Sequence, residues 1–227
     1  MINANESFLI ISPSLQGTIQ SIPRVSLEEF IDKCEPADII SSYLKSESFT
    51  TKKRMMWSRI LGLAQGSLFT TLKLVKNKKI IIGYGTRYEN IGSGKPIIVE
   101  ERSLERYLKH TGGSILMRPV KVLTPQEKKQ VIKYMTDRIG LRYNTSALFK
   151  TAWDRFTRRK MTPFFEKKIS DKEIDNFQEP LFCSTIITFA YKSAGINLKL
   201  SKNIFDTWPR DYLLSPNIWK ICYYKAD

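Results

Sequence analysis

The chain has 227 residues, of which 42% are hydrophobic and 26% are charged, and this composition indicates a globular protein with a sizeable core. No apolar run reaches the roughly 20 residues of a membrane helix, and the first residues do not predict a signal peptide. The net charge is +15, and three scattered cysteines with a single histidine exclude a disulfide framework or a zinc site of ordinary spacing.

Short apolar segments in the first half of the chain predict strands around one small helix. Residues 26–34 are the expected helix, because Ser26 and Glu29 form an S-x-x-E capping box. The last two strands of this half are joined by the polar turn 76–78, which is typical of a hairpin. The strands expected here are 8–12, 37–44, 68–75 and 79–85.

Helices are more prominent in the second half of the chain. The clearest one is 124–140, with Thr124 as N-cap, Pro125 in the first turn, Glu127 closing a capping box and Gly140 at the end. Its apolar stripe should face a core and consists of Val131, Ile132, Met135 and Ile139. The other elements expected here are the helices 103–110 and 183–194 and the strands 114–123 and 218–224.

A proline interrupts the strand 114–123. Because proline cannot donate a hydrogen bond to a ladder, we expect Pro119 at an edge or a bulge. No internal repeat and no clear linker divides the chain. One α+β domain is therefore expected, with its helices gathered at one side of an antiparallel sheet.

The stretch 182-FCSTIITFAYKSAG-195 places a cysteine at the first turn of an apolar helix. The positive end of a helix dipole stabilises a thiolate and lowers the pKa of a thiol, so Cys183 is a candidate nucleophile. The alternative is a small buried structural residue, since free cysteine is among the most buried residue types. Both interpretations stay open on this stretch alone.

Four segments together resemble a known family. They are 37-ADII-40, 114-SILMRPVKVLTPQEKKQVIKYMTDRIGLRYN-144, 182-FCSTIITFAYKSAGINL-198 and 208-WPRDYLLSPNIWKI-221. This set is similar to the circularly permuted NlpC/P60 proteins, in particular the YiiX/YebB-like papain-fold amidases and peptidases. The resemblance implies a permuted papain-like α+β fold, in which an antiparallel sheet or partial barrel packs against helices.

The resemblance also implies the catalytic positions. Cys183 matches the family's nucleophile, whose thiolate attacks a carbonyl carbon. The family's base is a histidine at the start of a strand, and Thr71 stands at that position here, while Gly83 lies near the position of the third polar residue. Neither residue can accept a thiol proton near neutral pH. Two of the three catalytic positions therefore lack a working group.

A replacement base has two possible sources, which are the single histidine, His110, and a partner chain. Without one, we expect a catalytically degenerate protein that serves as a structural or binding component of a larger assembly, such as a phage or virus particle. The alternative is an active cysteine amidase or peptidase that acts on peptidoglycan peptides or similar amides. A third possibility, lipid acyl transfer, lacks the Asn-Cys-Glu-His run of the relatives that catalyse it.

The positive charge bears on the partners of the protein. An acidic protein surface or a nucleic acid would be attracted, whereas the alternative is a solvated lysine-rich surface. No nucleic-acid-reading motif accompanies the basic clusters. The candidate anion patch consists of Lys52, Lys53, Arg54, Arg158, Arg159 and Lys160.

The remaining expectations concern boundaries, location and ligands. Residues 1–35 are expected as an N-terminal extension and residues 36–227 as the permuted domain. A cytoplasmic or virion location, protein partners in an assembly and no transmembrane segment are expected. Neither a metal nor a cofactor is predicted.

Overall fold

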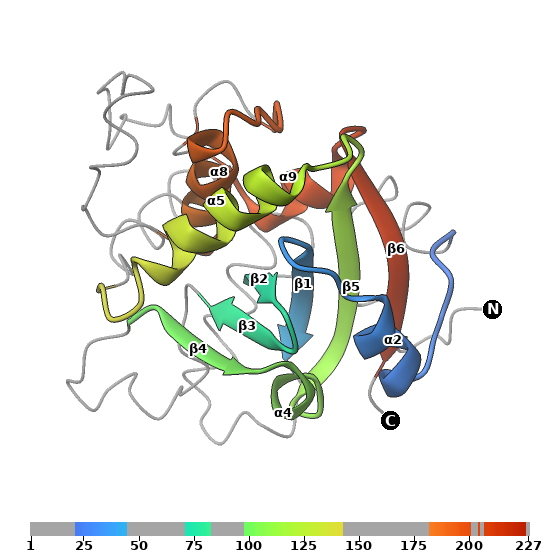
Figure 1. The fold of residues 1–227 in the computed structure, drawn as a ribbon. Coiled ribbons are helices and arrows are strands. Elements are labelled where there is room, and N and C mark those ends of the chain that lie inside the picture. The colour runs from blue at the N-terminus through green and yellow to red at the C-terminus, as the bar shows by residue number, and fades with distance from the viewer. Residues whose placement is uncertain are drawn as a thin grey trace, which may run out of the picture.

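A computed structural model of the protein describes residues 21–44, 71–82, 98–142, 182–200, 204 and 207–225. Within these ranges six strands form one open sheet in the order β4-β3-β2-β1-β5-β6, and every neighbouring pair is antiparallel (Figure 1). The strands are β1 (Ile39–Leu44), β2 (Thr71–Lys76), β3 (Lys79–Ile82), β4 (Glu100–Ser103), β5 (Thr111–Pro119) and β6 (Ile218–Lys225). The antiparallel sheet of an α+β protein is confirmed.

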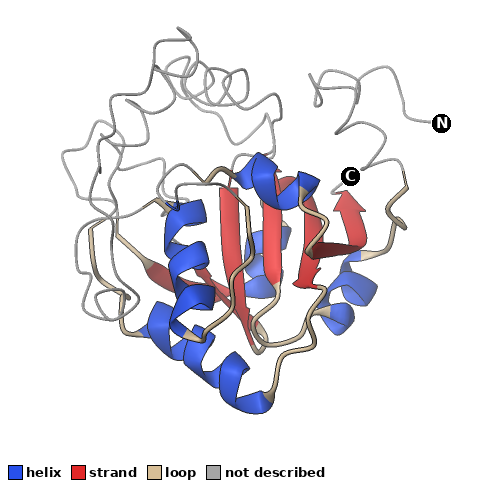
Figure 2. Cartoon of the chain, turned by 90° about the horizontal axis from the view of Figure 1, so that it is seen from above, coloured by secondary structure: helices blue, strands red, loops and turns tan. Residues whose placement is uncertain are grey.

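Helices cover both faces of this sheet, as the view from above shows (Figure 2). They are α2 (Leu27–Lys33), α4 (Leu104–Leu108), α5 (Pro125–Thr136), α8 (Cys183–Ser193) and α9 (Pro209–Leu214). One hydrophobic cluster joins α5, α8 and α9 to one face, and a second joins α2 and α4 to the other. The expectation that the helices gather at one side was wrong, because the strands bury apolar side chains on both faces.

The strand residues alternate between the two clusters, as the pleat of a strand requires. Ile39, Leu72 and Leu74 face the helices α5, α8 and α9. Ile40 and Val75 face α2 and α4. This alternation fixes the direction of every side chain on β2.

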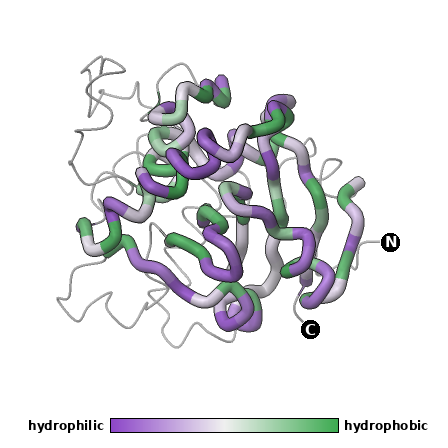
Figure 3. The backbone as a smooth tube through the Cα atoms, in the orientation of Figure 1, coloured by the Kyte–Doolittle hydropathy of each residue, from purple (hydrophilic) through white to green (hydrophobic). Residues whose placement is uncertain are grey.

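The predicted caps of α5 are present. The Thr124 side chain accepts a hydrogen bond from the Glu127 backbone, and the Glu127 carboxylate accepts one from the Thr124 backbone at 2.8 Å. Hydrophobic and hydrophilic residues alternate along the helix (Figure 3). Gly140 ends the following turn with a φ of +92°, a conformation that favours glycine. Ile139 lies in that turn and is 40% exposed, so its expected place in the buried stripe was wrong.

Pro119 is the last residue of β5, which is an inner strand between β1 and β6. Its missing N–H therefore falls where the ladder ends, and the next residue, Val120, donates its N–H to the Asn217 carbonyl at 2.9 Å. The register between β5 and β6 shifts nearby, between Leu116 and Met117. The expectation of an edge or a bulge at Pro119 was wrong, because β5 is an inner strand and the irregularity lies two residues before the proline.

The described part of the segment before residue 36, residues 21–35, packs on the sheet. Phe30 of α2 is fully buried in the cluster that includes α4, and Tyr223 of β6 bonds to the backbone of Pro23 and Val25. The boundary at residue 35 stays a prediction, and the strand expected at 8–12 lies outside the described residues. No helix in the described ranges is long and apolar enough to cross a membrane.

Candidate functional site

Cys183 is the first residue of α8, as the sequence predicted. The preceding Phe182 is the N-cap in an extended conformation, and it makes no side-chain capping bond. The Cys183 side chain is only 3% exposed and belongs to the cluster that also contains Ile186, Ile187 and Ala190. The sulfur therefore lies at the positive end of a helix dipole inside the protein.

Hydrogen bonds hold both ends of α8. The Ser184 hydroxyl donates to the Thr207 carbonyl, and the Tyr212 hydroxyl donates to the Ser184 carbonyl at 2.8 Å. Near the other end, the Tyr191 hydroxyl donates to the Ala37 carbonyl just before β1. The position of Cys183 over the sheet is thus fixed by packing and by bonds to three other segments.

Thr71 opens β2 but does not face α8. Leu72 and Leu74 belong to the Cys183 cluster, whereas Val75 belongs to the α4 cluster, so strand alternation turns Thr71 toward α4. The Thr71 hydroxyl donates to the Ser42 carbonyl at 3.0 Å. The side chain that β2 contributes to the Cys183 cluster at its start is therefore Leu72, which cannot act as a base.

Lys73 is a residue that the sequence reasoning missed. It follows Thr71 on the same face of β2 and is fully buried. Its amine donates to the Thr71 hydroxyl and lies 4.5 Å from the centroid of the Tyr107 ring. Burial lowers the pKa of Lys73 to about 7, and a negative charge on Cys183 opposes that shift.

Cys183 is also electrostatically coupled to two tyrosines. Burial is the main cause that raises the pKa values of Tyr107 and Tyr212, and a negative charge on Cys183 adds to both shifts. A charge on the sulfur would thus be felt on both faces of the sheet. Among the described residues, the groups coupled to it also include the Lys73 amine.

His110 lies on the α4 side of the molecule, just beyond the end of that helix, whereas α8 lies at the opposite side of the sheet in Figure 1. Its ring is exposed, and Nδ1 is 2.8 Å from the Arg106 carbonyl oxygen. Because the chain has one histidine, the described geometry brings no imidazole of this chain to Cys183.

The other candidate positions are placed as follows. Gly83 and the basic clusters at 52–54 and 158–160 lie outside the described residues. Glu101 is ion-paired with Lys76 and Lys79, each at 2.8 Å. No group of three or more histidine, cysteine or acidic side chains in the described ranges could hold a metal ion.

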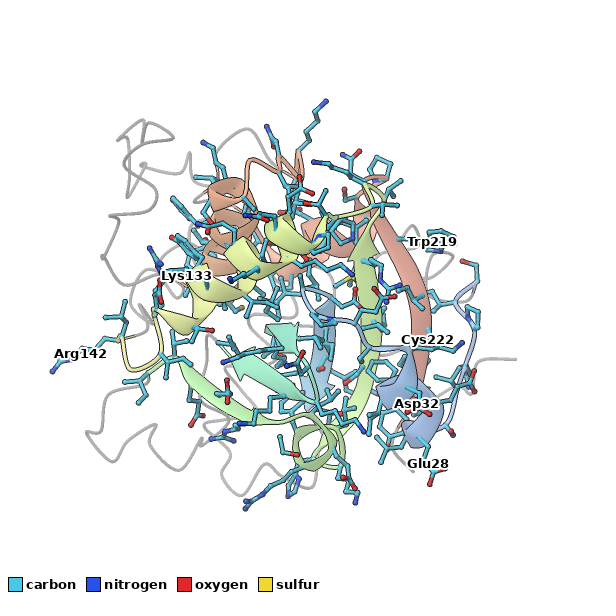
Figure 4. The ribbon with its side chains drawn as sticks, in the orientation of Figure 1. Glu28, Asp32, Lys133, Arg142, Trp219 and Cys222 are labelled. Atoms are coloured by element: carbon cyan, nitrogen blue, oxygen red, sulfur yellow. The ribbon has the colours of Figure 1, made fainter. Side chains whose placement is uncertain are left out.

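Two cysteines lie away from α8. Cys222 is on β6 (Figure 4), and burial raises its pKa to about 12. Burial also raises the pKa of Cys34, whose thiol donates to the Phe30 carbonyl at 3.2 Å. Both thiols stay protonated at neutral pH and are suited to packing more than to reaction.

An ion pair joins two of the segments that carry the resemblance. Asp38 precedes β1, is 2% exposed and accepts two hydrogen bonds of 2.7 Å from Arg118 on β5. Burial raises the pKa of Asp38, and the guanidinium opposes that shift. Ala37 has a φ of +71°, a left-handed backbone conformation that favours glycine. These residues therefore shape the start of β1.

Comparison of the sequence with models of known protein families found no match, and neither did comparison with curated proteins. The fold, however, is similar to the crystal structure of the metalloprotein yiiX from Escherichia coli O157:H7, DUF1105, with a TM-score of 0.50 and 15% identity. The likeness covers 83% of this chain and 96% of that one. It shows a YiiX-like α+β fold, and at this identity it shows the fold alone.

Proposed function

We propose that the protein is a non-catalytic member of the permuted NlpC/P60 type, retained as a structural or binding component of a larger assembly such as a phage or virus particle. The proposal goes beyond the YiiX-like fold, which carries no activity by itself. It keeps Cys183 as a buried packing residue at the start of α8.

The observation that carries this proposal is the chemistry facing Cys183. The start of β2 contributes Leu72 to the Cys183 cluster, while Thr71 turns to the other face. The single histidine has an exposed ring beyond α4. A general base or acid is typically worth about 10²–10⁴ in rate, and the chain's one imidazole does not supply it to Cys183 in the described residues.

The net charge of +15 supports a binding role. Such a charge attracts polyanions and acidic protein surfaces and raises their rate of association. It does not select a sequence or a fold in the partner. An acidic component of the assembly or its nucleic acid would therefore be the partner expected on these grounds.

Thiol chemistry tests the proposal. In a chain whose Cys34 and Cys222 are replaced by serine, we expect iodoacetamide to alkylate Cys183 no faster than a model thiol at pH 7. Cys183→Ala should leave amide hydrolysis at background. Faster alkylation, together with hydrolysis that Cys183→Ala abolishes, would show an active enzyme and overturn the proposal.

A matched pair of histidine variants tests the geometry. Leu72→His would place an imidazole in the Cys183 cluster and should raise thiol reactivity, because an imidazole can take the thiol proton. Thr71→His would face α4 and should have no such effect. The reverse result, with circular dichroism confirming that both variants fold, would mean that the family's histidine position is Thr71.

One observation favours the alternative, a cysteine amidase or peptidase with Cys183 as nucleophile. Burial lowers the pKa of Lys73 to about 7, so part of the amine is unprotonated at neutral pH, and the amine is electrostatically coupled to Cys183. Against this, Lys73 faces α4 and bonds to Thr71. If the alternative holds, Lys73→Met abolishes hydrolysis along with Cys183→Ala, whereas the non-catalytic proposal expects no hydrolysis to lose.

A further inference from the structure

Three apolar side chains are exposed where β5 leaves the sheet beside the start of β6. Val120 is 55% exposed, Val122 is 90% exposed and Trp219 is 68% exposed. The other exposed large hydrophobic side chains of the described ranges reach 40% at most. These three residues, the valine–tryptophan patch, are therefore the most exposed large apolar groups in the part of the chain that the structure describes.

The pairing of β5 with β6 brings the patch together. Trp219 lies opposite Arg118 in the register. The pairing continues past the end of β5, where the Val120 N–H donates to the Asn217 carbonyl at 2.9 Å. Val120 and Trp219 are thus diagonal neighbours, within reach of an aromatic side chain. Val122 follows Val120 by two residues, so the patch gathers at one end of the β5–β6 pair, with Trp219 at the outer side of β6 (Figure 4).

The edge of β6 next to the patch is already bonded. The Ile218 N–H donates to the Ser215 carbonyl at 3.3 Å, and the Ile218 carbonyl accepts from the Lys220 amine at 2.8 Å. Further along, the N–H and the carbonyl of Tyr223 bond to the segment that precedes α2. A strand from a partner or from a second copy would have to displace these bonds, so contacts at the patch fall to its side chains.

Lysines alternate with the apolar residues of the patch. Lys121 lies between the two valines, and Lys220 follows Trp219. The Lys121 side chain is 58% exposed, and an ion pair at the surface such as the one it forms with Glu127 is worth little and is readily exchanged for another anion. Lysine is depleted from protein–protein interfaces, whereas lysine beside tryptophan is typical of segments that lie at a membrane surface. The arrangement therefore fits a layer of anionic headgroups better than the core of a protein interface.

We propose that the valine–tryptophan patch is a peripheral membrane contact that inserts into the headgroup layer of an anionic bilayer. Tryptophan prefers the depth of the headgroups, and a chain of charge +15 is attracted to anionic lipids. A second copy of the chain would bring another large positive charge to the same place, which opposes self-association. This inference goes beyond the proposed function and does not depend on Cys183.

The test uses the full chain and two kinds of vesicle, one of phosphatidylcholine and one of equal parts phosphatidylcholine and phosphatidylserine. Co-sedimentation should show binding to the vesicles that contain phosphatidylserine, and added salt should weaken it by screening the surface potential. Trp219→Ala should weaken the apparent affinity by about tenfold, since it removes the largest apolar group that the bilayer would bury. Val122→Ser should weaken it in the same direction.

Ile139→Ala is the matched control, because it removes an exposed apolar side chain beyond the other end of α5. It should leave binding unchanged. Trp219→Phe keeps an apolar ring and should still bind, but the blue shift of tryptophan emission that the vesicles cause should be smaller than in the wild type. This difference assigns the shift to Trp219 and not to the other three tryptophans of the chain, which has four.

Three results would overturn the proposal. One is equal binding by the wild type, Trp219→Ala and Val122→Ser, with circular dichroism showing that all fold, because net charge alone would then attract the bilayer. Another is no binding to phosphatidylserine vesicles at low salt. The third is a dimer in sedimentation equilibrium that Trp219→Ala dissociates, which would make the patch an interface between copies of the chain.

Discussion

Lys73 should make the stability of the protein depend on pH. Its folded-state pKa of about 7 lies below the ordinary value of 10.5, so the unfolded chain binds more protons between these limits. Stability should therefore rise with pH across this window, while the full cost of burying the amine applies below pH 7. Lys73→Met should stabilise the protein by about 1–4 kcal/mol at pH 7, because it removes an amine that is costly to bury.

Urea denaturation at pH 7 and pH 9.5 measures this effect. The gain from Lys73→Met should be smaller at pH 9.5. At that pH the amine of the unfolded chain is closer to its ordinary pKa, so losing the proton on folding costs less free energy. Lys78→Met, which changes an exposed lysine of the neighbouring turn, should leave stability within about 0.5 kcal/mol at both pH values. A Lys73→Met variant that is less stable than the wild type at pH 7 would contradict the assignment of a costly buried amine.

The sequence was informative about Cys183 and uninformative about Lys73 for one physical reason. A helix start leaves local signals, such as the apolar stripe that follows Cys183. A strand that is buried on both faces leaves none: in 71-TLKLV-75 both alternating sets are buried, so the pattern does not say which set meets α8. A lysine there is ordinarily expected to face solvent.

At the level of single elements, the capping box of α5 should contribute measurably to stability. Thr124→Ala removes the side chain that accepts from the Glu127 N–H at 3.2 Å, and a lost N-cap typically costs about 1 kcal/mol. The midpoint of urea unfolding should fall accordingly. Thr124→Ser keeps an acceptor at the same position and should recover most of the loss. If Ser were as destabilising as Ala, the cap would not be the cause.

Elements with local end signals could be predicted, and their arrangement could not. The helices α2, α5 and α8 begin within a residue of their predicted starts, because caps and stripes are local. The inner position of Pro119 and the split of helices between two faces depend on which strands become neighbours. β1, for example, lies between β2 and β5, which is far along the chain, and no local pattern encodes that pairing.

At the level of the whole molecule, the fold and the charge carry different information. The YiiX-like fold places Cys183 at a helix start and pairs Asp38, just before β1, with Arg118 of β5. The charge of +15 belongs to the surface and is independent of that arrangement. Several described lysines are already ion-paired with carboxylates at the surface, including Lys79, Lys109 and Lys133. Excess charge is therefore expected to act through lysines and arginines other than these.

Binding to duplex DNA tests how that charge acts. If about six basic residues contact phosphates, the logarithm of the affinity should fall with the logarithm of salt concentration with a slope of about −5. Fluorescence anisotropy with a labelled duplex between 50 and 200 mM salt measures the slope, roughly the range in which such contacts lose most of their affinity. Replacing Lys52, Lys53 and Arg54 with alanine should make the slope less steep by up to about 3, and so should replacing Arg158, Arg159 and Lys160.

The control is a triple variant with Lys79, Lys109 and Lys133 changed to alanine, which removes the same charge from side chains that already have carboxylate partners. Because each triple variant removes three positive charges, the net charge of the control falls as much as that of the cluster variants. An equal loss of DNA binding in all three variants would mean that net charge alone attracts the duplex and that neither cluster is a contact surface. No binding at 50 mM salt would instead leave an acidic protein surface as the partner that the charge serves.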